Sequence, residues 1–93
     1  MVIGILYLEI YFPASHSLKE KRKNLNRLRD RLKKKFNVAY AELDFQNKWQ
    51  RTKLGVVTLN AKKHIVDKCI FSIIKDVEEN TYGELIHTHI DYF

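Results

Sequence analysis

Residues 2–12 read VIGILYLEIYF, and this stretch decides the fold. Its residues are apolar, β-branched and aromatic, with too little helical periodicity for a helix, so we predict a strand over Val2–Phe12. Side chains alternate between the two faces of a strand. One face then holds Val2, Leu6, Leu8, Ile10 and Phe12, and the other holds Ile3, Ile5, Tyr7, Glu9 and Tyr11. Pro13 has no N–H to donate, so it ends the strand.

A helix is predicted to begin after Ser17. Ser17 and Glu20 have the spacing of a capping box, in which each side chain accepts a free backbone N–H. Apolar residues then recur at spacings of seven, three, four and four, in the order Leu18, Leu25, Leu28, Leu32 and Phe36. This is a single narrow stripe on one side of a helix, which we expect to end at Asn37.

The rest of the chain predicts two more strands, a second helix and a final strand. The elements are a strand over Val38–Leu43, a polar connection over Asp44–Arg51, a strand over Thr52–Leu59, a helix from Ala61 to about Glu79, and a strand over Leu85–Tyr92. Asn60 is expected to cap the second helix, and Gly55 to mark a bulge or a close approach. The second helix should bury Val66, Cys69, Ile70, Ile73 and Val77, widened by Ile65, Phe71 and Ile74.

The element order is βαββαβ, which predicts an α+β domain of ferredoxin-like type over residues 1–93. Two right-handed split βαβ units place four antiparallel strands in one sheet and both helices on one face of it. The other face of the sheet is left open. That face would hold Ile3, Ile5 and Tyr7.

Length and composition bound the class of protein. The chain has 93 residues, of which 45% are hydrophobic and 30% charged, as in one globular domain. It has no apolar stretch of membrane-spanning length, and its start has neither the basic region nor the cleavage site of a signal peptide. Cys69 is the one cysteine, which excludes an intrachain disulfide and a CxxC pair. We expect a soluble cytoplasmic protein without a membrane partner.

The net charge of +6 is concentrated on the first helix. Residues 19–35 contain ten Lys or Arg and two acids, a net +8, whereas the rest of the chain has seven basic and nine acidic residues, a net −2. Lys23, Arg27 and Lys34 point directly away from the apolar stripe. Flanking positions are held by Arg22, Arg29 and Lys33 on one side, and by Lys21, Arg31 and Lys35 on the other.

Such a surface predicts binding to a polyanion, because Lys and Arg displace the counterions condensed on nucleic acid. We expect phosphate contacts from Lys19, Lys23, Arg27, Arg31 and Lys34, with secondary contacts from Trp49 and Arg51. A solvated helix, or one that pairs with acids on a neighbour, is the alternative. A membrane surface is less favoured, since the fold needs the apolar stripe for its core.

The open sheet face has two interpretations. Tyr7 and Tyr11 could stack bases as in RNA-recognition-motif domains, but the third predicted strand has no aromatic residue where that motif needs one. An apolar open face is more often buried against another subunit. We therefore predict a homodimer through Ile3, Ile5 and Tyr7, although pairing through an edge strand would also give a dimer.

Catalytic and metal sites are not indicated. His87 and His89 share one face of the last strand as an HxH pair, but no third metal ligand is evident, so a strand surface or a dimer contact is expected instead. Glu42 and Asp44 form a carboxylate pair without a pocket or a nucleophile. An acylphosphatase would need a glycine-rich loop where residues 13–17 read PASHS. We expect no enzyme activity, cofactor, metal or small-molecule substrate.

Four segments together resemble a known family. They are MVIG at 1–4, SLKEKR at 17–22, FNVAYAE at 36–42 and WQRTKLGV at 49–56. The chain is similar to the bacterial YlxP-like domain-of-unknown-function family along essentially its whole length. The resemblance implies a ferredoxin-like fold and no established activity. Genes of that family often lie beside translation-initiation and ribosome-maturation genes, which implies an RNA or ribosomal partner by association only.

Two functions therefore remain open. The first is a non-enzymatic protein that binds structured RNA, rRNA or the ribosome through its basic helix. The second is a structural or regulatory homodimer whose partner is a protein and which has no affinity for nucleic acid.

Overall fold

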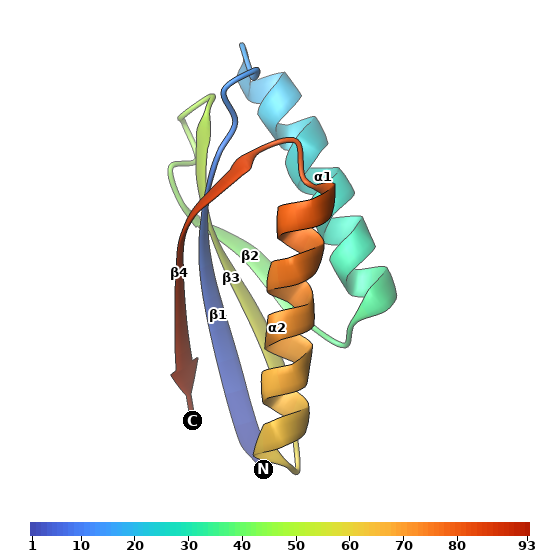
Figure 1. Cartoon of the computed structure of the whole chain (residues 1–93). Helices are drawn as coiled ribbons and strands as arrows, with labels where there is room; N and C mark the ends of the chain where they lie inside the picture. The colour runs from blue at the N-terminus through green and yellow to red at the C-terminus, as the bar shows by residue number, and fades with distance from the viewer.

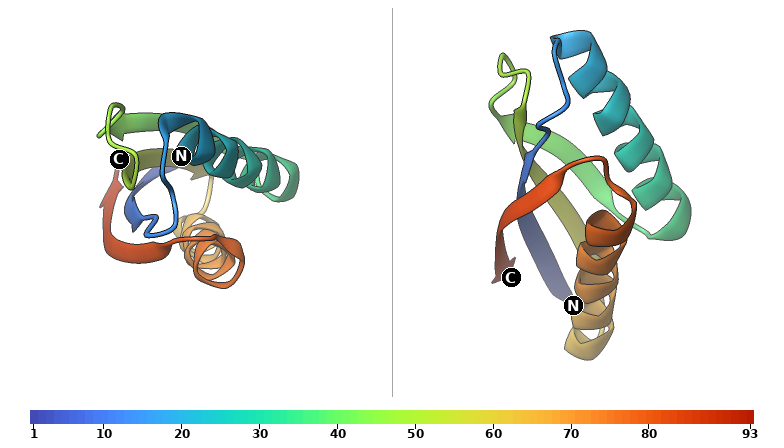
Figure 2. Two further views of the ribbon diagram at one scale, coloured as in Figure 1. Left: turned by 90° about the horizontal axis from the view of Figure 1, so that it is seen from above. Right: turned by 45° about the horizontal axis from the view of Figure 1, so that its top comes forward.

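The computed structural model describes all residues from 1 to 93. Its elements are β1 (Val2–Tyr11), α1 (Leu18–Lys35), β2 (Ala39–Asp44), β3 (Arg51–Asn60), α2 (Lys63–Asn80) and β4 (Glu84–Tyr92). The strands form one sheet in the order β2-β3-β1-β4, and each neighbouring pair is antiparallel. Both helices cover the same face of the sheet, and the other face is open (Figures 1 and 2). The predicted ferredoxin-like fold is confirmed.

The core lies between the sheet and the two helices. The predicted inner face of β1 is buried at Leu6, Leu8 and Ile10, and Phe12, just beyond the end of the strand at Tyr11, is buried with them. Above it lie the leucine stripe of α1 and the apolar face of α2, which contribute Leu25, Leu28, Leu32, Val66, Ile70, Ile73 and Val77. Each such side chain stabilises the fold by about 1.5–3 kcal/mol, so these two periodic patterns fix how both helices sit on the sheet.

The start of α1 follows the predicted cap with one difference. Ser17 Oγ accepts the backbone N–H of Glu20 at 3.1 Å, as in a capping box. The Glu20 carboxylate, however, accepts the N–H of His16 at 2.7 Å rather than that of Ser17. At the other end, α1 ends at Lys35, two residues before the predicted Asn37, and the N–H of the capping residue Phe36 donates to the carbonyl of Leu32.

The prediction for α2 was wrong in two respects. The helix begins at Lys63, and Asn60 accepts the N–H of Lys62 in the preceding turn instead of capping the helix. Ile65 and Phe71 are exposed and do not widen the buried face. At 100° per residue both lie roughly 100° or more from the line along which α2 contacts the sheet, so no element is placed to cover them.

Two glycines mark close approaches between elements. A Cβ on Gly55 of β3 would lie 2.9 Å from Leu43 Cδ1, which confirms the predicted close approach, whereas the bulge of this hairpin lies in β2 between Glu42 and Asp44. A Cβ on Gly4 of β1 would lie 2.5 Å from Val66 Cγ1 of α2. Helix α2 therefore packs directly on the backbone of β1.

The two termini lie at the same end of the molecule (Figure 1). Ile3 and Phe93 exchange two backbone hydrogen bonds of 2.8 Å there. The β2–β3 hairpin and the start of α1 lie together at the opposite end. Neither helix has the length and apolarity needed to cross a bilayer.

Candidate nucleic-acid interface

Lys21 is the one basic residue of α1 that lies in the interior. Its side chain is 1% exposed, and Nζ lies 3.1 Å from the Glu42 carboxylate. Nζ also donates to the carbonyls of Phe45 at 2.7 Å and Arg51 at 3.1 Å. Lys21 therefore ties the β2–β3 hairpin to α1. The sequence interpretation, which placed it on the flank of a positive surface, was wrong because the hairpin covers that flank.

Arg31 and Lys35 share one carboxylate of α2. Arg31 Nε donates to Asp76 at 2.6 Å and Lys35 Nζ donates to Asp76 at 2.7 Å. Asp76 is buried, which alone would raise its pKa, but the hydrogen bonds from Lys35 and Arg31 outweigh burial and hold the pKa below its usual value. The structure thus brings Arg31, which was predicted to contact phosphate, into an ion pair between the helices.

Six basic residues of α1 are exposed and have no acidic partner. They are Lys19, Arg22, Lys23, Arg27, Lys33 and Lys34, and we call them the basic surface. At 100° per residue they occupy an arc of roughly 140° opposite the leucine stripe. Four of the five α1 residues that were predicted to contact phosphate lie in this arc. The fifth, Arg31, pairs with Asp76 instead.

A shallow depression of about 290 Å³ lies beside the basic surface. Lys23 and Arg27 form one side of it, and Tyr82, from the turn between α2 and β4, forms the other. The Tyr82 side chain is 74% exposed. The sequence analysis did not include Tyr82 among the expected contacts. The sequence did offer one signal for Tyr82, because it is an aromatic residue in a turn that does not require an aromatic side chain.

The hairpin between β2 and β3 has a fixed conformation. Phe45 has a positive φ of 64°, which is uncommon for any residue except glycine and unfavourable for a large side chain. The Phe45 N–H donates to the Asp44 carboxylate at 2.7 Å, and its carbonyl accepts both the Lys48 N–H and Lys21 Nζ. The Asp44 carboxylate is thus bonded within the hairpin, and the Glu42 carboxylate is bonded to Lys21 and Thr52.

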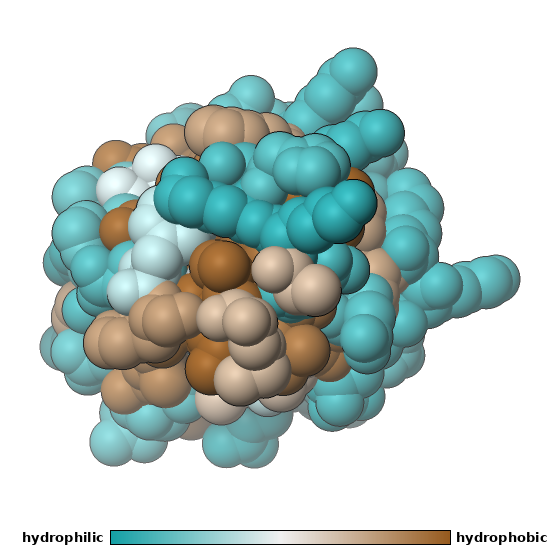
Figure 3. Space-filling view, turned by 90° about the horizontal axis from the view of Figure 1, so that it is seen from below, coloured by the Kyte–Doolittle hydropathy of each residue, from teal (hydrophilic) through white to brown (hydrophobic).

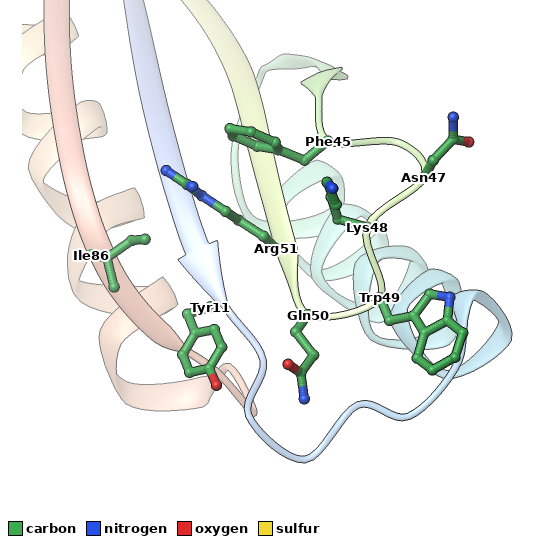
Figure 4. A pocket seen from close by; sticks show the side chains of 8 residues that line it. All are labelled: Tyr11, Phe45, Asn47, Lys48, Trp49, Gln50, Arg51 and Ile86. Carbon is green, nitrogen blue, oxygen red and sulfur yellow. The ribbon is translucent and has the colours of Figure 1, made fainter.

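A hollow of about 790 Å³ lies beside this hairpin, and we call it the hairpin hollow. It is lined by Tyr11, Phe45, Asn47, Lys48, Trp49, Gln50, Arg51 and Ile86 (Figure 4). The Arg51 guanidinium lies over the Phe45 ring at 4.2 Å and pairs with Glu9 at 3.3 Å. Trp49 is 56% exposed. Trp49 and Arg51 therefore both line this hollow, and the charge of Arg51 is already paired with Glu9.

The open sheet face has an apolar part and a polar part. Ile3, Ile5 and Tyr7 lie on it as predicted, and they pair across β3 with Leu59, Val57 and Gly55. Apolar residues also gather at the end of the molecule that holds the termini, with hydrophilic side chains around them (Figure 3). Leu59 and Phe93 are among the exposed residues of this end.

The polar part of this face holds the two histidines of β4. His87 lies opposite Glu9 and His89 lies opposite Tyr7. His89 Nε2 lies 3.0 Å from the Asp91 carboxylate, and its ring lies 5.9 Å from that of Tyr7. No group of three or more His, Cys, Asp or Glu is arranged to hold a metal ion. The histidines are thus part of a mixed polar surface.

The strand order and the two helices on one face define a protein of ferredoxin-like class. The solved structure of protein YjcS has a similar fold, with a TM-score of 0.58 at 13% identity over 96% of each chain. A dimeric ferredoxin-like protein from an uncultured marine organism is less similar, with a TM-score of 0.46 at 19% identity over 98% of this chain and 92% of that one.

The chain belongs to the family described as "Protein of unknown function (DUF503)", whose model matches residues 3–90. It is also similar to the uncharacterized protein YlxP of Bacillus subtilis (strain 168), with 29% identity over 92 residues, covering 99% of this chain and all of that protein. The resemblance seen in the sequence is confirmed. Neither description assigns a catalytic activity.

Proposed function

We propose that this protein is a non-enzymatic RNA-binding protein that docks structured RNA, free or within the ribosome, through the basic surface of α1. The observation that carries this proposal is the set of six exposed basic residues without an acidic partner, gathered on one arc of one helix. A duplex or folded RNA presents a dense array of phosphates, and each contact releases condensed counterions. A helix with an unbroken positive arc fits such a target.

The distribution of acids supports a polyanion rather than water as the partner. Like charges four residues apart destabilise a helix by a few tenths of a kcal/mol each. Asp76 relieves this repulsion at Arg31 and Lys35. The pairs Lys19–Lys23 and Lys23–Arg27 lie on the exposed arc without any such relief. A helix shaped by stability alone would carry acids there.

The test is a titration of a labelled RNA duplex followed by fluorescence anisotropy at several salt concentrations. Lys23→Glu with Arg27→Glu should weaken binding by roughly ten-fold or more and reduce the salt slope by about 2, because two phosphate contacts are lost. The reversed charge at position 23 lies one turn from Lys19 and that at position 27 lies one turn from Arg31, so α1 should stay folded.

The matched control is Lys68→Glu with Lys75→Glu on α2. Both lysines are exposed and face away from the sheet, so the net charge changes equally at a different place. It should leave most of the affinity intact. Equal losses of RNA affinity in the two double variants would show that only the net charge of the protein matters. Absence of salt-dependent RNA binding by the wild type would refute the proposal. Co-purification with ribosomal subunits at low and high salt extends the test to the ribosome.

A second candidate function is that of a homodimeric protein, and the apolar part of the open face favours it. Ile3, Ile5 and Tyr7 are only half-buried, and Leu43 and Leu59 beside them are exposed. The basic surface lies on the other side of the sheet (Figure 2). A second copy of this chain could therefore cover the face while the two positive helices stay far apart. Such a dimer is compatible with RNA binding and would present two basic surfaces.

A further inference from the structure

We propose that the hairpin hollow binds one unpaired nucleotide of the RNA, with its base stacked on Trp49 and its phosphate held by Lys48. The inference rests on the proposed RNA-binding function and adds selectivity to it. The basic surface would attract any folded RNA, and the hairpin hollow would favour RNA that displays a base outside a helix.

One wall of the hollow is held by hydrogen bonds around Phe45. Phe45 has φ 64°, and three hydrogen-bonding groups hold its backbone: the Asp44 carboxylate, the Lys48 N–H and Lys21 Nζ. Unfavourable backbone conformations persist where the surroundings impose them, and they are concentrated at functional sites. Lys21 imposes this one from the interior.

The lining has the groups that a nucleotide requires. Base stacking needs an accessible aromatic face, and it tolerates any base because every base has a π-face. The Phe45 face is covered by Arg51, so Trp49 and Tyr11 supply the free faces. Arg51 pairs with Glu9, whereas Lys48 has no acidic partner and is exposed. Lys48 is therefore the cation available to a phosphate. The amide of Asn47 lies on the same loop (Figure 4).

The position of the hollow favours an unpaired nucleotide that extends from a bound helix. The hairpin and the first turn of α1 lie at one end of the molecule, and Lys21 joins them directly (Figure 1). An RNA bound at Lys19, Arg22 and Lys23, in the first turns of α1, would therefore lie beside the hairpin. A base inside a duplex cannot present its face to a side chain, whereas a base in a loop or a bulge can. Trp49 would then read the absence of pairing rather than a sequence.

Trp49 is the only tryptophan of the chain, so it reports on this contact directly. The experiment compares two RNAs with the same stem, one closed by an adenine-rich loop and one a blunt duplex. The looped RNA should quench the Trp49 fluorescence on binding and protect it from acrylamide. The blunt duplex should bind without either effect.

Variants separate this inference from the proposed function. Trp49→Ala should lower the affinity for the looped RNA by roughly ten-fold and leave that for the duplex unchanged, since stacking on one aromatic contributes about that factor. Trp49→Phe keeps an aromatic face and should retain most of the affinity. Lys23→Glu with Arg27→Glu should weaken the binding of both RNAs equally. Trp49 is mostly exposed, so an unchanged unfolding midpoint is expected as the check on folding.

Each of the following results would overturn the inference. A Trp49 signal that is the same with both RNAs, or absent with both while salt-dependent binding persists, refutes the hollow and leaves the basic surface in place. An equal loss of affinity for both RNAs in Trp49→Ala would likewise refute the hollow and leave the basic surface in place. Failure of the wild type to bind either RNA refutes the hollow together with the proposed function.

Discussion

At the scale of single residues, Lys21 differs most from its neighbours in the sequence. It lies between exposed residues of the same charge, yet its ammonium is buried against Glu42 and two carbonyls of the hairpin. Removal of one partner from a buried ion pair leaves the other charge without compensation. The Glu42 carboxylate also accepts a hydrogen bond from the Thr52 hydroxyl at 2.6 Å. Lys21 thus links helix, hairpin and sheet.

We predict that Lys21→Met lowers the free energy of unfolding by roughly 3 kcal/mol, measured by urea denaturation, because Glu42 and the hairpin carbonyls lose their donor. Lys23→Met, on the exposed side of the same helix, should change it by less than about 0.5 kcal/mol. Equal effects at the two positions would show that the burial of Lys21 is not what stabilises the hairpin.

At the scale of elements, α1 and α2 are joined by the buried carboxylate of Asp76. Arg31 and Lys35, one turn apart on α1, both donate to it. Arg31 also donates to the hydroxyl of Thr81 at 3.3 Å, just beyond the end of α2. This contact orients the two helices, and it pairs two positive charges of α1 with one acid.

The pH dependence of stability tests this contact. Burial opposes the ionised form of Asp76, but the bonds from Lys35 and Arg31 lower its pKa below the ordinary 3.8. The stabilisation is therefore complete above about pH 4 and is lost as the pH falls through the lowered pKa. Asp76→Asn should cost about 2 kcal/mol at neutral pH, measured by urea denaturation. The difference between the two proteins should narrow in acid, and a constant difference would contradict the ion pair.

At the scale of the whole molecule, the sheet separates two unlike surfaces. The helix side carries the basic surface, and the open side carries the apolar residues around Ile5 and Tyr7. A domain of this size buries a limited fraction of its own surface, so a second copy offers a direct way to cover the open side. Two-fold association is the simplest closed arrangement.

We predict a dimer for the wild type in light scattering, and a monomer for Tyr7→Glu, because a charge at the centre of an apolar interface loses its hydration. Lys75→Glu on the outer side of α2 is the control and should remain dimeric. A monomeric wild type at concentrations of about 100 μM, well above the Kd of a stable dimer, would refute association through this face.

Most of the fold could be predicted because its signals are local. The alternation of β1, the leucine stripe of α1 and the Ser17 cap each depend on residues within a few positions of one another. The exposed positions of Ile65 and Phe71 could not be predicted in the same way. Apolar character alone does not say how wide a stripe the neighbouring sheet can cover.

The sequence by itself determined the element order, the inner face of the sheet and the concentration of positive charge on α1, since each follows from composition and short-range periodicity. Only the tertiary structure decided which positive charges of the chain are free. Arg31 meets Asp76 across 45 residues of chain, and Arg51 meets Glu9 across 42. Such partners are brought together by the packing of the helices and the register of the strands, and both arise only when the whole chain folds.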